Sequence, residues 1–402
     1  MMMSDAVKDR SVGLSMADLT APAPRKARLA TLRQLEDGLR QKGYVQIASS
    51  PALDALTHKV YEASAALLAD QDACASLRRD ALYAGGGTHL ALTYLGLNEE
   101  PLYDAAAGSQ LVRSLNIHEC LSEAEMDSRL PPDYDGEERA LARAYHSPPP
   151  CAAAQPLLMA SAALRKALAA EMCEPLLAAL GLVLGLDDGA LGKRCRGLTS
   201  DNTSLLRCLE YPQAPGASAA EASPKGGTAT GSWGVSEHTD FELFSLLHER
   251  APGLQVRSPA GRWTMPEGGG WVMIVGDMLG RISMGYFQPT PHRVLVTQAS
   301  ASSPRRSLVF FNALDELDEV VPLTATVARR SCTGAFRRWL DEDDGLDHAV
   351  ALAMAPLLQR QPITQREWCE LKEEAARQRL KRARPSDDRV IPQLRAKEKD
   401  IK

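Results

Sequence analysis

The chain has 402 residues, which is enough for one large domain or two ordinary ones with an extensive core. Hydrophobic residues make up 45% and charged residues 24% of the chain, values typical of globular proteins. The net charge of −5 gives no general attraction to nucleic acid or to an anionic membrane. We therefore expect neither a nucleic-acid partner nor membrane association.

The N-terminal twenty residues contain early acidic residues and no apolar stretch, so we expect no secretory signal. None of the eight cysteines has C-x-x-C spacing, which argues against a zinc knuckle and a dense disulfide framework. These features favour a reduced, cytoplasmic protein, and we expect a monomer. Residues 371–402 contain eleven Lys or Arg and six Asp or Glu, so a nuclear location is the less favoured alternative.

The first half of the chain is rich in helical patterns. Leucines spaced three or four residues apart predict a helix over 25–43 that ends at Gly43, followed by a short strand over 44–50. Dense Ala and Leu predict further helix over 52–80, and two helices fit 156–186. The intervening residues 83–150 indicate loops around short elements.

After residue 198 short apolar runs alternate with Gly, Pro and Ser, a pattern typical of a β-sandwich or barrel. Residues 213–231 interrupt this pattern with sixteen small or turn-forming residues out of nineteen, and we expect a flexible surface loop there rather than a lid. The predicted organisation is a flexible N-terminus (1–24), a helical and mixed region (25–198), a strand-rich core (199–330), and a C-terminal helical region with a basic tail (331–402).

The stretch "WGVSEHTDFELF" (233–244) contains a candidate metal site. If a strand continues through it, His238 and Asp240 point to the same face. His292, which opens the apolar run "HRVLV", is the candidate third ligand. Two histidines and one carboxylate with open coordination positions are the facial triad of non-haem Fe(II) oxygenases, whereas a structural zinc site closes its coordination sphere. By contrast, we expect His248 at a strand end facing solvent.

The run "RRSLVFF" (305–311) supplies a candidate anion site. Strand alternation places Arg305, Ser307 and Phe311 on one face and Arg306 on the other. An arginine inside a barrel needs an anion, and its guanidinium can hold a carboxylate with two parallel hydrogen bonds. The strand alone leaves two alternatives open, a pair with a protein acid or exposure at the strand start. Phe311 either borders the substrate or is a core aromatic residue.

Six motifs then follow one another in the chain: "HTD", "GLQV", "GRW", "GD", "FQPTPHRV" and "RRSLVFF". In this order they resemble the isopenicillin N synthase-like branch of the 2-oxoglutarate/Fe(II)-dependent oxygenases. The resemblance covers roughly residues 200–315. It implies iron ligands and co-substrate contacts, which are His238, Asp240 and His292 for iron, and Arg305, Ser307 and Tyr211 for 2-oxoglutarate.

The resemblance also implies a mainly β fold, a double-stranded β-helix (jelly roll) flanked by α-helices. The implied activity is oxidation, most commonly hydroxylation, of a small molecule with dioxygen and 2-oxoglutarate, releasing succinate and CO2, with ascorbate as an optional supporting reductant. Leu209 and Met284 replace asparagines that are usual in the family, so substrate identity does not transfer. Two alternatives remain: an iron oxidase of the same fold that does not use 2-oxoglutarate, and a non-catalytic metal-binding jelly-roll protein.

Overall fold

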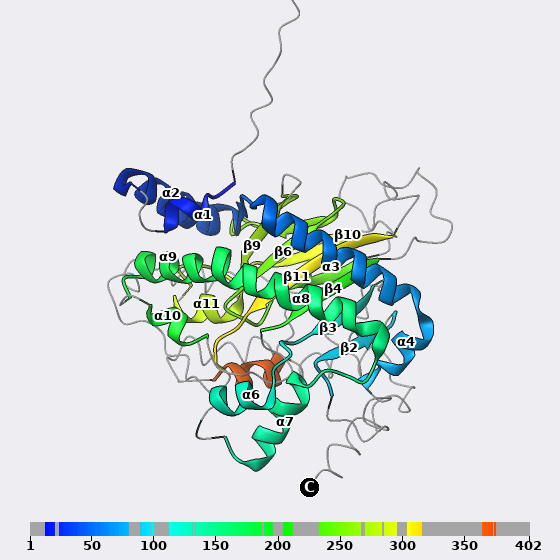
Figure 1. Cartoon of the computed structure of the whole chain (residues 1–402). Helices are drawn as coiled ribbons and strands as arrows, with labels where there is room; N and C mark the ends of the chain where they lie inside the picture. Colours follow the sequence, from blue (N-terminus) through cyan, green and yellow to red (C-terminus); the bar gives the residue numbers. More distant parts are fainter. Residues whose placement is uncertain are drawn as a thin grey trace, which may run out of the picture.

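The structure is a computed structural model, shown in Figure 1. It describes the following residues: 13–20, 24–79, 89–97, 99, 112–130, 132, 134–186, 189–195, 204–211, 233–266, 270–283, 285–295, 304–315, 364–372 and 374. The predicted insertion at 213–231 lies outside them.

Two antiparallel sheets form the centre of the molecule. The larger has the strand order β1-β9-β6-β11-β4-β3-β2 and the smaller has the order β5-β10-β7-β8. This arrangement, with helices around it, confirms the predicted mainly β core of jelly-roll type. The strands are β1 (Tyr44–Ile47), β2 (Leu92–Leu95), β3 (Arg113–Ile117), β4 (Leu206–Tyr211), β5 (Trp233–His238), β6 (Phe244–Glu249), β7 (Leu254–Arg257), β8 (Trp263–Thr264), β9 (Trp271–Val275), β10 (His292–Leu295) and β11 (Arg305–Asn312).

The larger sheet draws strands from both halves of the chain. Strands β1, β2 and β3 belong to the predicted N-terminal region, yet β1 pairs with β9 and β3 pairs with β4. The N-terminal region is therefore part of the sheet on which the core is built. The predicted boundary between residues 198 and 199 falls outside the described residues.

Helices cover the outer face of the larger sheet, where α3 and α8 run side by side (Figure 1). The predicted helices of the first half are confirmed, and α2 is extended by a π-helical turn, η1, that ends at Gly43 in the left-handed conformation. The labelled helices are α1 (Met16–Leu19), α2 (Arg25–Asp37), η1 (Gly38–Lys42), α3 (Pro51–Ala69), α4 (Gln71–Ser76), α6 (Glu123–Arg129), α7 (Gly136–His146), η3 (Ala152–Ala154), α8 (Gln155–Leu168), η4 (Ala169–Cys173), α9 (Glu174–Leu184), α10 (Ala190–Lys193) and α11 (Asp277–Ile282). A further helix covers residues 365–372 and is called the C-terminal helix below.

Helices α6 and α7 lie in the stretch for which the sequence predicted mainly loops. Each begins with a capping box, at Ser122 with Glu125 and at Asp135 with Glu138. In a capping box the side chains of the cap and of the third helical residue satisfy each other's backbone N–H groups. The S-x-x-E and D-x-x-E spacings were therefore the sequence signal for these helices.

The apolar segment Ala152–Leu184 forms one continuous 33-residue helical stretch, long and apolar enough to cross a membrane by length and composition. More than half of its most apolar window is buried inside the protein, and α8 packs against α3. Buried core helices pass the same test, so this helix is weak evidence for a membrane span.

Alternation along β11 divides its side chains between two cores. Leu308 and Phe310 join the core between the larger sheet and the helices. Val309 and Phe311 join a second core between the two sheets, together with residues of β5, β7 and β10. The space between the sheets is therefore reached by every second residue of β11, starting with Arg305.

His248 belongs to the outer, helix-covered face of β6. Its Nδ1 lies 3.0 Å from the Tyr61 hydroxyl of α3, and its ring is 5.2 Å from the Trp271 ring. Burial lowers the pKa of His248 to about 4. The prediction that His248 faces solvent is therefore wrong, because α3 covers this end of the strand.

Leu308→Ala, in the core between the larger sheet and the helices, should strongly lower the free energy of unfolding. Leu308 is fully buried, and truncation of such a leucine destabilises a protein by about 2–5 kcal/mol. Leu182→Ala on exposed α9 surface should change the free energy of unfolding by about 0.5 kcal/mol or less. Urea unfolding of both variants measures the difference, and equal effects would contradict the assignment of this core.

Candidate metal centre

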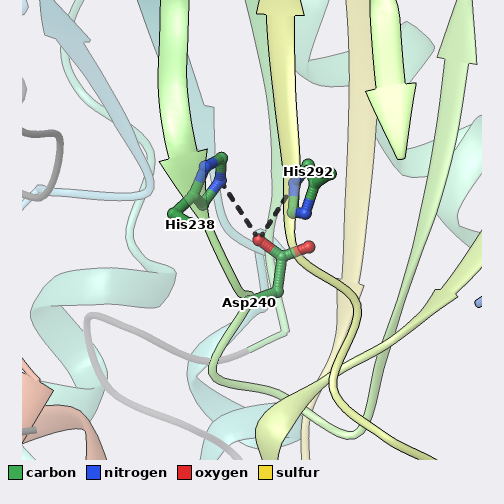
Figure 2. A group of neighbouring side chains, drawn as sticks. All are labelled: His238, Asp240 and His292. Carbon is green, nitrogen blue, oxygen red and sulfur yellow. Dashed lines mark ion pairs between the residues drawn. The ribbon is translucent and has the colours of Figure 1, made fainter. Parts of the chain in front are cut away.

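His238, Asp240 and His292 converge at one end of the smaller sheet (Figure 2). Strand β5 ends at His238, β10 begins at His292, and these two residues are direct cross-strand partners. Asp240 Oδ1 lies 3.6 Å from His238 Nε2 and 3.7 Å from His292 Nε2. The structure thus brings together all three ligands predicted from the sequence.

The expectation that one strand carries both His238 and Asp240 is wrong. Asp240 follows the end of β5, so strand alternation does not set its direction. Its carboxylate is instead held by Ser245, whose hydroxyl donates to Asp240 Oδ2. This bond leaves Oδ1 directed at the two imidazoles, as Figure 2 shows.

Both imidazoles are also oriented by the backbone. His238 Nδ1 is 2.9 Å from the Ser236 carbonyl oxygen, and His292 Nδ1 is 3.1 Å from the Thr290 carbonyl oxygen. A carbonyl can only accept a hydrogen bond, so the proton is on Nδ1 and each Nε2 carries the lone pair that can bind a metal ion. Such outer-shell bonds fix the tautomer and the ring direction of metal-binding histidines.

Electrostatics favour the neutral imidazole. Burial, and next the electrostatic interaction with the neighbouring His292 imidazole, lowers the pKa of His238 well below its usual range, while the hydrogen bond with Ser236 opposes the shift. Neutral imidazole is the form that binds a metal ion. Two nitrogen donors and one carboxylate oxygen therefore fit a divalent transition metal, and this donor set is the one used by non-haem Fe(II) sites.

Arg305 lies between the sheets and has a protein partner. It forms an ion pair with Glu249, donates from Nε to the Ala251 carbonyl oxygen at 3.1 Å, and stacks on the Tyr211 ring. Of the two alternatives that the strand left open, a pair with a protein acid is thus correct for Nη2 of the guanidinium. Its Nη1, however, is buried without a hydrogen-bond partner among the described residues.

A buried donor without a partner is destabilising by about 1–3 kcal/mol, and a ligand carboxylate would satisfy it. Tyr211 and Ser307 lie beside Arg305, with the Tyr211 hydroxyl in hydrogen-bonding reach of both side chains. Burial raises the pKa of Tyr211, so the phenol stays protonated and able to donate. This set of three donors fits the distal carboxylate of 2-oxoglutarate.

Gly253 of the "GLQV" motif makes room for this guanidinium. A Cβ at this position would lie 2.6 Å from Arg305 Nε and 2.9 Å from the Leu295 carbonyl oxygen. Both contacts are too short for any side chain. The glycine, which directly precedes β7, is thus required by the close approach of its backbone to Arg305 and Leu295.

Arg306 points to the opposite face of β11, as predicted. It is more than a surface residue, however, because its ion pair is with Glu210, which is buried and also paired with Arg113. These contacts connect β11, β4 and β3 outside the space between the sheets. Phe311 is buried beside the site and stacks under Arg207.

The C-terminal helix, residues 365–372, contacts the loop that carries Asp240. Lys372 donates to the Thr239 hydroxyl at 3.0 Å and pairs with Asp277 at 2.9 Å. Trp368 donates to the same Asp277 carboxylate, whose backbone N–H donates to the Asp240 carbonyl oxygen. The metal-ligand loop is thereby attached to a helix that is distant in sequence.

Sequence reasoning missed Glu249, Ser245 and Lys372. The first two share the inward face of β6 with Leu247, so alternation along "FSLLHE" was a usable signal. Lys372 gave no local signal, since its role depends on where a distant helix docks.

Comparison with known proteins shows what the sequence around this site is similar to. Residues 202–313 match the 2OG-Fe(II) oxygenase superfamily. Gibberellin 2-beta-dioxygenase 2 of Oryza sativa subsp. japonica is 35% identical over 170 residues, which are 40% of this chain and 44% of the relative. The chain spans less than half the length of the first curated relatives it matches.

Solved structures share the fold. A full-length protein of Neurospora crassa, crystallised in complex with alpha-KG, has a TM-score of 0.58 at 16% identity, covering 94% of this chain and 100% of that one. A 2OG-Fe(II) oxygenase family protein from Caulobacter crescentus has a TM-score of 0.57 at 19% identity, covering 83% and 99%. At these identities the likeness concerns the fold alone.

Replacement of any one of the three ligands should abolish high-affinity metal binding. His238→Ala, Asp240→Ala and His292→Ala each remove one donor from a site held by the sheets, so far-ultraviolet circular dichroism should match the wild type. Equilibrium titration with Fe(II) under anaerobic conditions measures the loss. Wild-type affinity in any of the three variants would contradict the ligand assignment.

Lys372→Met should weaken Fe(II) binding about tenfold, because outer-shell contacts hold the ligand loop. Arg366→Met is the matched control, since Arg366 lies on the same helix but pairs with Glu138, away from the loop. Anaerobic Fe(II) titration compares the two. Equal affinities would show that the helix only packs against the loop.

Proposed function

We propose that this protein is a 2-oxoglutarate- and Fe(II)-dependent dioxygenase of the isopenicillin N synthase-like branch, because residues 202–313 match the 2OG-Fe(II) oxygenase superfamily and its curated relatives include dioxygenases. The proposed reaction is oxidation, most commonly hydroxylation, of a small organic molecule, with release of succinate and CO2. The observation that carries the proposal is the pairing of a His-Asp-His set with a buried arginine between the same two sheets, whose Nη1 has no hydrogen-bond partner among the described residues.

In this proposal the residues of the chain bind and orient the metal ion and the co-substrate. His238 Nε2, Asp240 Oδ1 and His292 Nε2 hold Fe(II), and the Arg305, Ser307 and Tyr211 side chains hold the distal carboxylate of 2-oxoglutarate. Bound Fe(II) supplies the activation of dioxygen and couples it to oxidative decarboxylation of the co-substrate. The apolar core between the sheets limits the access of water to the site.

The nature of the relatives supports a small-molecule substrate. They include a gibberellin dioxygenase, leucoanthocyanidin dioxygenase 1 of Oryza sativa subsp. indica and validamycin A dioxygenase of Streptomyces hygroscopicus subsp. limoneus. We further propose a cytoplasmic monomer that does not act on nucleic acid. The described cysteines are free thiols, as is typical of a reducing compartment.

The nearer competing function is an oxidase of the same fold in which Arg305 binds the substrate's own carboxylate. The two functions differ in product. With Fe(II), ascorbate, dioxygen and 2-oxoglutarate, the proposed dioxygenase releases succinate in amounts matched to oxidised substrate, and an untargeted metabolite comparison identifies that substrate. Substrate oxidation without 2-oxoglutarate would favour the oxidase, and Fe(II) binding without oxygen consumption would favour a non-catalytic protein.

The two adjacent arginines predict different effects. Arg305→Lys removes the planar fork that a carboxylate needs, so the 2-oxoglutarate concentration for half-maximal succinate release should rise on the order of a hundredfold. Arg306→Lys should leave that concentration nearly unchanged, although its pair with buried Glu210 makes some loss of stability expected. If the effects were exchanged, or if neither variant changed the 2-oxoglutarate requirement, the role of Arg305 would be wrong.

A further inference from the structure

Arg305 lies between the sheets already paired with a carboxylate of the chain. Glu249 is the cross-strand partner of Ser307, so β6 places it on the same face as the proposed co-substrate site. Its Oε2 accepts from Arg305 Nη2, and the side chains of Arg305 and Glu249 are only 3% and 14% exposed. Two charges of opposite sign are therefore buried together, and the pair carries no net charge.

Glu249 is held in this position by the turn that joins β6 to β7. The backbone N–H of Leu254 donates to the same Glu249 Oε2 at 3.1 Å. Arg250, the next residue in the chain, contacts α3 instead, because its Nη2 lies 2.8 Å from His58 Nδ1 and its Cζ lies 5.1 Å from the centre of the Tyr61 ring. The turn thus keeps Glu249 beside the co-substrate site, whereas the neighbouring arginine packs on a helix.

The guanidinium of Arg305 keeps one nitrogen for a ligand. Nε donates to the Ala251 carbonyl oxygen at 3.1 Å and Nη2 donates to Glu249, whereas Nη1 is buried without a partner among the described residues. A carboxylate that accepts two parallel hydrogen bonds needs two neighbouring nitrogens, so at Nη1 it would share Nη2 with Glu249. A ligand carboxylate would therefore lie close to the carboxylate of Glu249, on the same guanidinium.

Glu249 also changes the charge that a co-substrate meets. A lone guanidinium attracts a ligand carboxylate strongly in a buried site, but beside an ion pair the repulsion by Glu249 offsets much of that attraction. Both members of the pair act on the neighbouring phenol of Tyr211: burial raises its pKa most, Arg305 lowers it, and Glu249 raises it. The negative charge of Glu249 is thus felt by the other donors of the same site.

We propose that Glu249 is a specificity-determining residue of the co-substrate site, which weakens the preference of Arg305 for a distal carboxylate and lets 2-oxo acids with an uncharged distal carbonyl bind as well. This inference rests on the proposed function, because it concerns the co-substrate of the same centre. The hydroxyls of Tyr211 and Ser307 and the Nη1 of Arg305 can each donate to a neutral carbonyl oxygen as they can to a carboxylate. The 2-oxo acid group is common to all these ligands and would bind at the metal.

The chain offers a matched control on the opposite face of β11. Glu210 of β4 is buried and is the cross-strand partner of Arg306, with which it forms an ion pair at 2.7 Å. Glu210→Gln therefore removes a buried carboxylate from the arginine next to Arg305, but outside the space between the sheets. A general effect of losing a buried ion pair appears in both variants, whereas an effect on the charge of the ligand is specific to Glu249→Gln.

The test is calorimetric titration of Mn(II)-loaded protein with 2-oxoglutarate and with 2,5-dioxohexanoate, in which a methyl ketone replaces the distal carboxylate. We expect wild-type protein to bind 2-oxoglutarate at most about tenfold more tightly than the ketone. Glu249→Gln should increase this ratio about tenfold, chiefly through tighter binding of 2-oxoglutarate, because the amide keeps the hydrogen bonds but not the charge. Glu249→Asp should stay closer to the wild-type ratio, and Glu210→Gln should leave it unchanged.

The proposal is overturned if the ratio in wild-type protein exceeds about tenfold, a result that needs no variant to fold. It is also overturned if Glu249→Gln does not increase the ratio, or if Glu249→Asp or Glu210→Gln increases it as much. The same titrations separate this proposal from the proposed function. If wild-type protein binds neither compound, the proposed function fails and the inference with it. If it binds 2-oxoglutarate and Glu249→Gln leaves the ratio unchanged, only the inference fails.

Discussion

The space between two packed sheets admits a charged group only when that charge finds a partner, and this constraint governs the arrangement of the candidate site. Asp240 is buried between two imidazoles and the Ser245 hydroxyl. Arg305 is buried against Glu249 but keeps one amino group without a partner among the described residues. These hydrogen bonds and ion pairs hold the side chains in place. The two imidazole Nε2 atoms and Asp240 Oδ1 then face a metal ion, and Arg305 Nη1 is available to an organic anion.

The helices and the N-terminal strands stabilise this centre without entering it. Alternation along β11 sends Leu308 and Phe310 into the helix-covered core and leaves Arg305 and Phe311 between the sheets. The C-terminal helix reaches the centre from outside through Lys372, which bonds to Thr239 between two of the candidate ligands. The stability of the fold thus depends on the helix-covered face of β11, and the candidate site on the face between the two sheets.

Much of this site could be predicted from sequence because its signals are local. The structure brings together the three ligands that were predicted from the "HTD" motif and from the start of the apolar run at His292. Arg305 and Ser307 share the inward face of β11, as strand alternation predicts. What could not be predicted depends on tertiary docking. Asp240 is directed by Ser245 rather than by strand geometry, and His248 is covered by α3 rather than by solvent.

The central claim is that one metal ion and one 2-oxoglutarate molecule share the space between the sheets. Equilibrium titration of 2-oxoglutarate into wild-type protein, with and without Mn(II), tests it most directly. If the metal ligands and Arg305 hold opposite ends of one co-substrate, a single molecule should bind per chain, and Mn(II) should increase its affinity on the order of a hundredfold, equivalent to about 2.7 kcal/mol of coupling. Binding that is absent, or equally tight with and without Mn(II), would contradict the account.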